Sequence, residues 1–315
     1  MFKIYKKVDG DLYDFTDICG KLALRSTSSE ISEELTFEIK GKFLQEDDVV
    51  ILCEDDKNIF QGIVITAEID ENTTSVTIYD FGWYINKSED VFQFNNTISK
   101  CITQICVDHG IPVGSIADIP IKYKGIIRGN LNDIISKLME YATKNNGIKY
   151  IWAMREGKFY LEKETSNVVI YSTKLFGDDI DITKLMSGVK IKRSIENLVN
   201  AVKVVDQEES LISVLAYKED TASIAKHGKI QKLESINKDE RSTANNVATN
   251  QLKLLNKVTV SAPVTLPGIT ACRADKILKF DDTIVGLTGS FKVTQCTHNI
   301  GGTSHLMDLT LELMN

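Results

Sequence analysis

The sequence predicts a mixed, mainly β fold in which two β regions enclose an inserted α+β region. Three observations support this prediction: apolar and polar residues alternate over residues 1–90, the period becomes helical over 91–165, and alternation returns toward the C-terminus. The 315 residues suffice for two or three domains. We expect these parts: a β-barrel at 1–90, an α+β domain at 91–168, a second β-barrel at 169–205 plus 257–315, and a smaller mixed insertion at 206–256.

Residues 1–90 are expected to form short strands that close into a small barrel. In the segment 34–40, Leu35, Phe37 and Ile39 fall on one face, as in a half-buried strand. Three further strands are predicted at 48–53, 60–69 and 74–80, with a polar turn joining the last two as a hairpin. Gly62 inside a strand indicates a bulge or a bend.

The α+β region should contain two helices followed by a hairpin. The first helix is expected to be capped by Asn95 or Asn96, to bury Ile98, Cys101, Ile102, Ile105 and Cys106, and to end at Gly110. The second helix should open near Asn130 and stop at Gly147. Strands at 148–154 and 158–162 then form the hairpin.

The C-terminal part returns to β structure around a polar insertion. Strands are expected within 189–205, a helix over 244–255, and a hairpin formed by 290–298 and 305–313. This hairpin and the one at 62–79 share their alternation, and each follows an acidic turn. We therefore expect an internal repeat of two related β domains.

Composition describes a soluble globular protein, with 43% hydrophobic and 26% charged residues and a net charge of -7. That charge excludes a globally basic nucleic-acid binder. The whole excess of negative charge lies between Arg25 and Asp56, a segment with ten acidic and three basic residues. No apolar run could span a membrane, and Met1 to Lys7 has no signal-peptide core, so we expect neither secretion nor disulfides among the six cysteines.

Candidate chemistry is sparse. Cys296, His298 and His305 form the one cluster of metal-ligand residue types, and no acid completes a tetrahedral zinc site. The chain has no nucleophile elbow, phosphate-binding loop or dinucleotide motif. We therefore expect no catalytic, metal or cofactor-binding residues and no cofactor, and a function that rests on shape and contact.

The helix end and turn at 105–116 reads ICVDHGIPVGSI. Six further segments spread over nearly the whole chain carry the same resemblance: 79–85, 92–98, 131–135, 147–150, 194–204 and 305–311. Together these segments resemble the hub proteins of contractile phage-tail baseplates of the XkdQ/YqbQ type, which are similar to late control protein D. The segment 105–116 is the most specific part of the resemblance.

The resemblance implies a non-enzymatic baseplate hub subunit with two barrels like the tail-tube subunit. Three chains would form a ring that adapts the sixfold tube to the threefold central spike. The implied partners are further copies of the chain, the tube protein, the spike protein and baseplate wedge proteins, with the tape measure protein as a further candidate. Stable nucleic-acid binding and membrane insertion are not expected.

The implied location is the baseplate of a virion or of a tail-like bacteriocin particle, assembled in the host bacterial cytoplasm. The sequence does not distinguish the two kinds of particle. Because the last hairpin is directly followed by Asn315, we expect no C-terminal hydrolase domain.

Two alternatives to the hub remain open. One is a tail-associated cell-wall hydrolase or accessory enzyme that uses Cys296, His298 and His305 or paired acids. The other is a carbohydrate-binding module, for which the two Trp residues provide little stacking surface. If the barrels line a tube, an acidic face with Glu34, Glu38, Asp47 and Asp48 could point into the lumen and repel passing DNA. A solvated outer face would explain these acids equally well.

Overall fold

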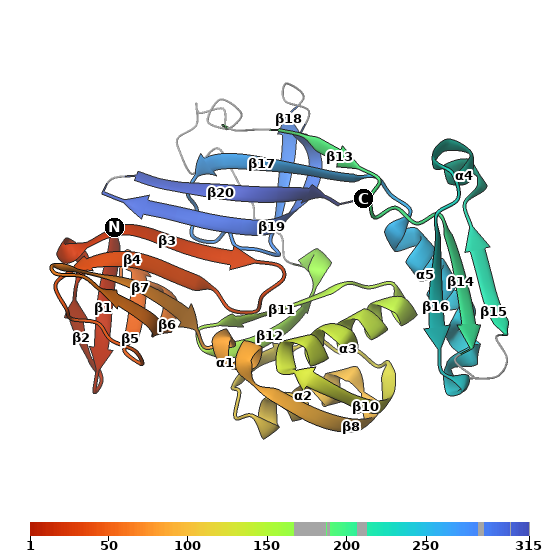
Figure 1. Ribbon diagram of the computed structural model, residues 1–315, viewed down its shortest axis with the longest axis horizontal. Coiled ribbons are helices and arrows are strands. Elements are labelled where there is room, and N and C mark those ends of the chain that lie inside the picture. The colour runs from red at the N-terminus through yellow and green to blue at the C-terminus, as the bar shows by residue number, and fades with distance from the viewer. Residues whose placement is uncertain (167–186, 188–189, 207–212, 283–286, 303, 315) are drawn as a thin grey trace.

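The computed structural model describes residues 1–166, 187, 190–206, 213–282, 287–302 and 304–314. The fold is mixed and mainly β, as predicted (Figure 1). Part of the expected second β region, residues 169–186, lies outside the described residues. None of the described helices is long and apolar enough to cross a membrane.

Seven strands form the first β unit, with the predicted hairpin and strand alternation. Leu35, Phe37 and Ile39 are buried in its core, whereas their neighbours face outward. The elements are β1 (Phe2–Val8), β2 (Asp11–Asp14), a 3-10 turn (Thr16–Ile18), β3 (Cys19–Thr27), β4 (Glu34–Lys40), β5 (Val49–Glu54), β6 (Lys57–Ile69) and β7 (Thr73–Asp80).

Five strands form the second β unit, which ends with the predicted C-terminal hairpin. They are β13 (Lys192–Ser194), β17 (Thr259–Pro267), β18 (Ile277–Asp282), β19 (Leu287–Gly301) and β20 (Ser304–Leu313). Neighbouring strands in this unit follow the order β13-β17-β20-β19-β18, and those of the first unit the order β3-β4-β7-β6-β5. Counted from β3 in the first unit and from β13 in the second, this order is the first, second, fifth, fourth and third strand along the chain. The shared order is the structural counterpart of the internal repeat.

The two β units share one twelve-stranded sheet, because β3 of the first unit pairs with β19 of the second. The pairing follows an open path that ends at β2 and β13 in the described residues, so it does not form the closed barrels that we expected. The physical reason is the length of β19: its first half pairs with β18, and its second half pairs with β3.

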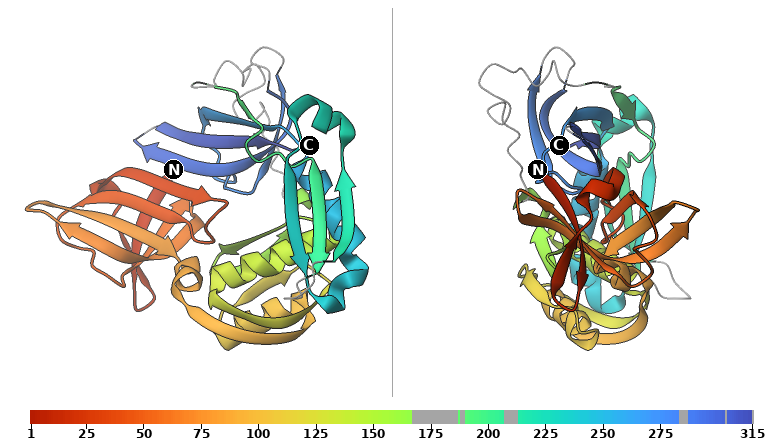
Figure 2. Two further views of the ribbon diagram at one scale, coloured as in Figure 1. Left: turned by 45° about the vertical axis from the view of Figure 1, so that its right-hand side comes forward. Right: turned by 90° about the vertical axis from the view of Figure 1, so that its left-hand side faces the viewer.

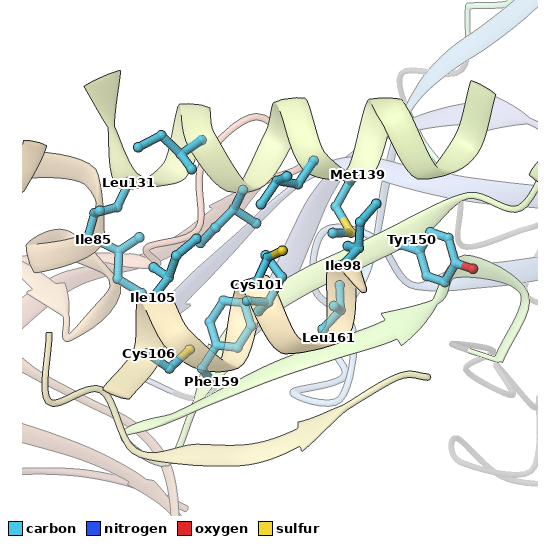
Figure 3. Packing of buried hydrophobic residues seen from close by; sticks show 14 of the residues in the cluster. Ile85, Ile98, Cys101, Ile105, Cys106, Leu131, Met139, Tyr150, Phe159 and Leu161 are labelled. Atoms are coloured by element: carbon cyan, nitrogen blue, oxygen red, sulfur yellow. The ribbon is translucent and has the colours of Figure 1, made fainter. Parts of the chain in front are cut away.

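The α+β unit has the two predicted helices packed face to face over a hairpin (Figure 3). Asn130 caps the second helix and Gly147 ends it with φ 73°, as expected. The first helix begins later than predicted, with Thr97 as its cap, because residues 89–97 continue as a strand. The elements are α1 (Gly82–Lys87), β8 (Glu89–Thr97), α2 (Ile98–Asp108), β9 (Val113–Ile116), β10 (Lys122–Asn130), α3 (Leu131–Asn146), β11 (Tyr150–Arg155), β12 (Lys158–Lys163) and a 3-10 turn (Glu164–Ser166).

A small three-stranded unit lies at the end of the molecule opposite the first β unit (Figures 1 and 2). Its elements are β14 (Ala201–Asp206), β15 (Val214–Glu219), α4 (Thr221–His227), β16 (Gln231–Ile236), a 3-10 helix (Lys238–Thr243) and the predicted helix α5 (Ala244–Leu255). We placed β14 in the second β unit, but it pairs with β15 and β16 because its apolar side chains pack on α5.

Gly62 is required by a close backbone approach between β6 and β7. A Cβ at this position would lie 2.3 Å from the carbonyl oxygen of Tyr79, and a backbone atom cannot rotate away. Gly62→Ala should therefore lower the free energy of unfolding by about 2 kcal/mol, measured by chemical denaturation. Gly20→Ala on β3 is the matched control, since its Cβ would have no neighbour within 4 Å. Equal losses for the two variants would contradict the steric explanation.

Candidate functional site

The junction between the two β units is the main candidate site. Six antiparallel residue pairs join β3 and β19, from Thr27 opposite Gln295 to Leu22 opposite Ile300. The loop before β18 reinforces the junction, since the amide of Ala274 donates to Oγ of Ser26 at 2.8 Å. The contact between the units is therefore built from backbone and side-chain hydrogen bonds together.

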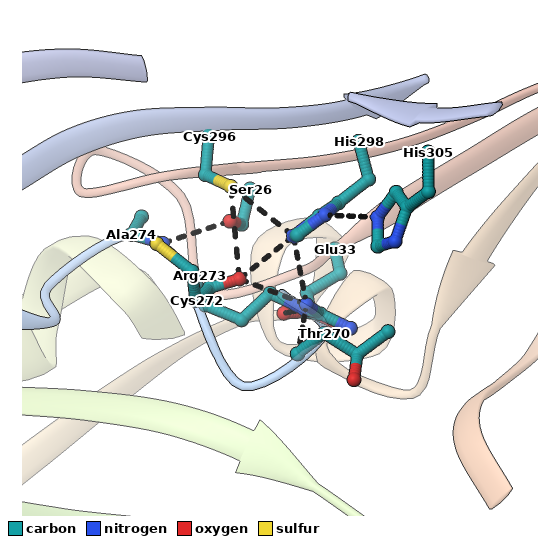
Figure 4. A network of polar contacts seen from close by, with 9 residues as sticks. All are labelled: Ser26, Glu33, Thr270, Cys272, Arg273, Ala274, Cys296, His298 and His305. Atoms are coloured by element: carbon teal, nitrogen blue, oxygen red, sulfur yellow. Dashed lines mark hydrogen bonds and ion pairs between the residues drawn. The ribbon is translucent and has the colours of Figure 1, made fainter. Parts of the chain in front are cut away.

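A polar cluster lies behind this pairing and includes Arg273, His298, His305, Glu33 and the thiols of Cys272 and Cys296 (Figure 4). Arg273 is at its centre. Its Nη1 lies 2.9 Å from Nε2 of His298, and its Nε lies 2.9 Å from Oε1 of Glu33. One guanidinium thus connects the last hairpin to the loop that precedes β4 in the first unit.

His298 is held as a neutral ring. Only 1% of its surface is exposed, and its Nδ1 lies 2.9 Å from Nε2 of His305. Burial, followed by the charge of Arg273, lowers the pKa of His298 to about 3. Burial also lowers the pKa of His305. A neutral imidazole offers one donor and one acceptor, which suits a site with hydrogen-bond partners on both sides.

Burial also raises the pKa of two acids, Glu33 in the cluster and Asp80 beside it. The pKa of Glu33 is raised because burial outweighs the attraction of Arg273. Asp80, whose Oδ1 accepts from the amide of Gly82 at 2.9 Å, has a pKa raised by burial and then by Glu33. A cavity of about 490 Å³ lies beside these acids, between the first β unit, the β11–β12 hairpin and the loop 270–276. Its mixed charges indicate no particular class of ligand.

Three residues singled out in the sequence, Cys296, His298 and His305, do come together. Sγ of Cys296 lies 3.2 Å from Nε2 of His298. In the described residues, however, no group of three or more metal-ligand side chains could hold an ion, and Arg273 places a positive charge beside the ring. Sequence reasoning missed Arg273 and Cys272, because a loop residue close in space to His298 leaves no periodic signal.

The four predicted acidic residues do not share one surface. Glu34 and Glu38 lie on the outward face of β4, where Glu34 accepts from the hydroxyl of Tyr79 and Glu38 pairs with Lys21. Asp47 and Asp48 lie in the turn before β5, and Asp48 pairs with Lys6 of β1 at 2.7 Å. The outward face of the shared sheet therefore carries two of the four acids.

Similarity to known proteins identifies the family. The model of the YqbQ-like family matches residues 14–312. The chain belongs to the YqbQ-like family. The phage-like element PBSX protein XkdQ of Bacillus subtilis is 25% identical over 275 residues, which cover 84% of this chain and 81% of that protein. The resemblance found in the sequence is thereby confirmed.

Two solved structures have a similar fold along the whole chain. The tail protein from Neisseria meningitidis MC58 has a TM-score of 0.69 at 12% identity, covering 99% of this chain and 96% of its own. The 43 kDa tail protein of prophage MuSo2 from Shewanella oneidensis has a TM-score of 0.66 at 14% identity and covers 98% of both chains. At these identities the similarity concerns the fold of this YqbQ-like protein.

Acid should weaken the protein through His298. The unfolded ring binds a proton near pH 6.5 and the folded ring only near pH 3, so the unfolded state holds more protons between these values. Stability is thus fully present above pH 6.5 and declines as the pH falls toward 3. At pH 5 the loss should be about 2 kcal/mol. Urea denaturation at several pH values measures it. The slope should flatten in His298→Gln and persist in Asn299→Gln; an unchanged slope in His298→Gln would contradict this assignment.

Removing Arg273 should leave Glu33 without its ionic partner in a largely buried site. We expect Arg273→Met to cost about 3 kcal/mol of unfolding free energy. Glu33→Gln removes the carboxylate charge that Arg273→Met leaves unpaired. The double variant Arg273→Met/Glu33→Gln should therefore be more stable than the sum of the two single losses predicts. A double-mutant cycle from denaturation curves measures this coupling, and strict additivity would show that the ion pair contributes nothing.

Proposed function

We propose that this protein is a structural subunit of a contractile tail and forms the baseplate hub. In this proposal three copies make a ring that adapts the sixfold tail tube to the threefold central spike. Its contacts are with the tube, the spike and the baseplate wedge proteins, with the tape measure protein as a further candidate. The particle, phage or tail-like bacteriocin, assembles in the bacterial cytoplasm.

The observation that carries this proposal is the shared sheet with its repeated strand order. Two units with the same order, 1-2-5-4-3, lie side by side in each chain, so three chains would present six similar units to a sixfold tube. A ring of this kind needs a head-to-tail contact, and the β3–β19 junction is already such a contact within one chain. The relatives reported above, which are named as tail proteins and a phage-like element protein, agree with a tail component.

The outward face of the shared sheet suits the lining of a channel. One row across it reads Thr265, Asp308, Thr297, Arg25, Glu34 and Tyr79. These side chains are polar and of both charges, and Asp308 accepts from Thr265 at 2.6 Å and from Asn299 at 2.7 Å. We propose that this face, with Glu34 and Glu38, lines the lumen, and that Asp47 and Asp48 lie away from it.

The hydrolase alternative has little support at its candidate residues. Cys296 and His298 are buried, and the ring nitrogens of His298 already have hydrogen-bond partners, so no substrate could reach them. The carbohydrate alternative is equally weak: the indole nitrogen of Trp152 donates to Asn132, and Trp83 packs edge-on against Tyr84.

Electron cryomicroscopy of intact particles tests the hub proposal. Three copies of the chain should occupy a ring between the last tube disc and the spike, with the row from Thr265 to Tyr79 facing the channel. Particles assembled without this chain should lack a spike attached to the tube. Density for the chain at the periphery of the baseplate would contradict the proposal.

A further inference from the structure

The internal junction indicates which strand edges a second copy of the chain would meet. Within one chain, β19, the fourth strand of the repeated five-strand order in the second unit, pairs with β3, the first strand of that order in the first unit. The corresponding strands, β6 and β13, both have a free edge in the described residues. Among the described residues, no strand pairs with the β5 side of β6 from Thr66 to Ile69, since β5 pairs only as far as Ile63. The structure, as far as it is described, also pairs β13 with β17 alone.

Two β-bulges align the strands of the two units. The register of β6 with β7 shifts between Val64 and Thr66, and that of β19 with β20 shifts between Val293 and Gln295. Thr66 therefore corresponds to Gln295. Counting on from this position gives two further equivalences: Glu68 with Thr297, and Ile69 with His298.

The first strands of the two units are aligned through their neighbours. Val64 is opposite Ile78, which is opposite Leu35; in the second unit Val293 is opposite Leu311, which is opposite Ala262. Leu35 and Ala262 are thus equivalent, and so are the residues before them, Glu34 and Ser261. Since Arg25 is opposite Glu34 and Lys192 is opposite Ser261, Lys192 corresponds to Arg25 and Ile191 corresponds to Leu24.

Thr297 is opposite Arg25 in the internal junction, and His298 is opposite Leu24. We propose that β6 of one copy pairs antiparallel with β13 of the next copy, with Glu68 opposite Lys192, and that the pairing continues one residue before β13, with Ile69 opposite Ile191. This register, which rests on the proposed hub ring, repeats the internal junction between chains.

The side chains at this proposed contact are complementary. Glu68 and Lys192 carry opposite charges, both are exposed, and neither forms an ion pair within the described residues. Ile69 and Ile191 are 55% and 41% exposed, which is high for isoleucine. Leu24, the counterpart of Ile191, is only 1% exposed and belongs to the apolar core of the first unit, together with Ile300 of β19. In the proposed contact, a second copy would cover part of the two exposed isoleucines.

The same contact would also cover two strand edges that are exposed in a single chain. An exposed strand edge invites uncontrolled pairing, and pairing β6 with β13 removes this liability at both strands. Because β6 and β13 belong to different units of the chain, the contact is heterologous and joins copies head to tail. Each unit then meets its two neighbours through equivalent junctions, one internal and one between chains.

Cysteine cross-linking in assembled particles tests the register. Glu68→Cys with Lys192→Cys should give disulfide-linked dimers and trimers on denaturing gels after mild oxidation with copper phenanthroline, because directly opposed residues are close enough to bridge. Each single variant and the native chain should stay monomeric on the gel, since five of the six native cysteines are buried. The matched control pair, Glu68→Cys with Arg193→Cys, points to opposite faces and should cross-link at least about fivefold less.

A charge exchange provides a second measurement that does not need cysteines. Glu68→Lys or Lys192→Glu alone should reduce the yield of assembled particles, because like charges then face each other, and the double exchange should restore it. Glu46→Lys, at an exposed acid outside the contact, should have no effect. Particles with the chain in the ring but without in-register cross-links, or without recovery in the double exchange, would overturn the register alone. Density for the chain outside the ring would overturn both proposals.

Discussion

The pairing of β3 with β19 is the constraint on which the rest of the structure depends. β19 is fifteen residues long. Its first half pairs with β18 of its own unit, and its second half pairs with β3 of the first unit. A register slip of one residue would turn every side chain of β19 to the opposite face of the sheet. The strand would then place His298 on the outward face and Thr297 in the core. The burial pattern of β19 therefore fixes its register against β3, and with it the orientation of the two units.

Other contacts build on this fixed strand. Lys292 in β19 lies 2.8 Å from Asp275 of the preceding loop and 2.9 Å from Glu164 of the α+β unit, so one ammonium group connects two parts of the chain. Behind the pairing, Arg273 lies beside the buried, neutral ring of His298 and forms an ion pair with the partly buried Glu33. Such a network is costly to bury and weak as a source of stability. The geometry that these contacts require favours one register of β19. His298 and Cys296, which the sequence suggested as candidate metal or catalytic residues, therefore have a structural role.

Local patterns explain which features the sequence predicted. The helices over 98–108, 131–146 and 244–255 and the two hairpins follow from apolar periodicity and from caps such as Asn130 and Gly147, which act within a few residues. Pairings between segments that are distant along the chain produce no comparable local pattern in the sequence. The β8–β10 pair, the position of β14 and the junction itself depend on partners far along the chain, and so does the contact of Arg273 with Glu33. An open sheet in place of two closed barrels has the same origin.

The N-terminal acidic cluster has a conformational explanation as well as an electrostatic one. Asp47, Asp55 and Asp56 have φ of 68°, 48° and 64°, in the left-handed region that aspartate tolerates better than most residues. Asp55 and Asp56 also pair with the N-terminal amine and with Lys3, which close β1 onto β5. Part of the net charge of -7 thus reflects tight turns around a short sheet. The acids left on the outward face, Glu34 and Glu38, lie beside Arg25, Lys21 and the hydroxyl group of Tyr79. A channel lined by this face would therefore repel polyanions only weakly.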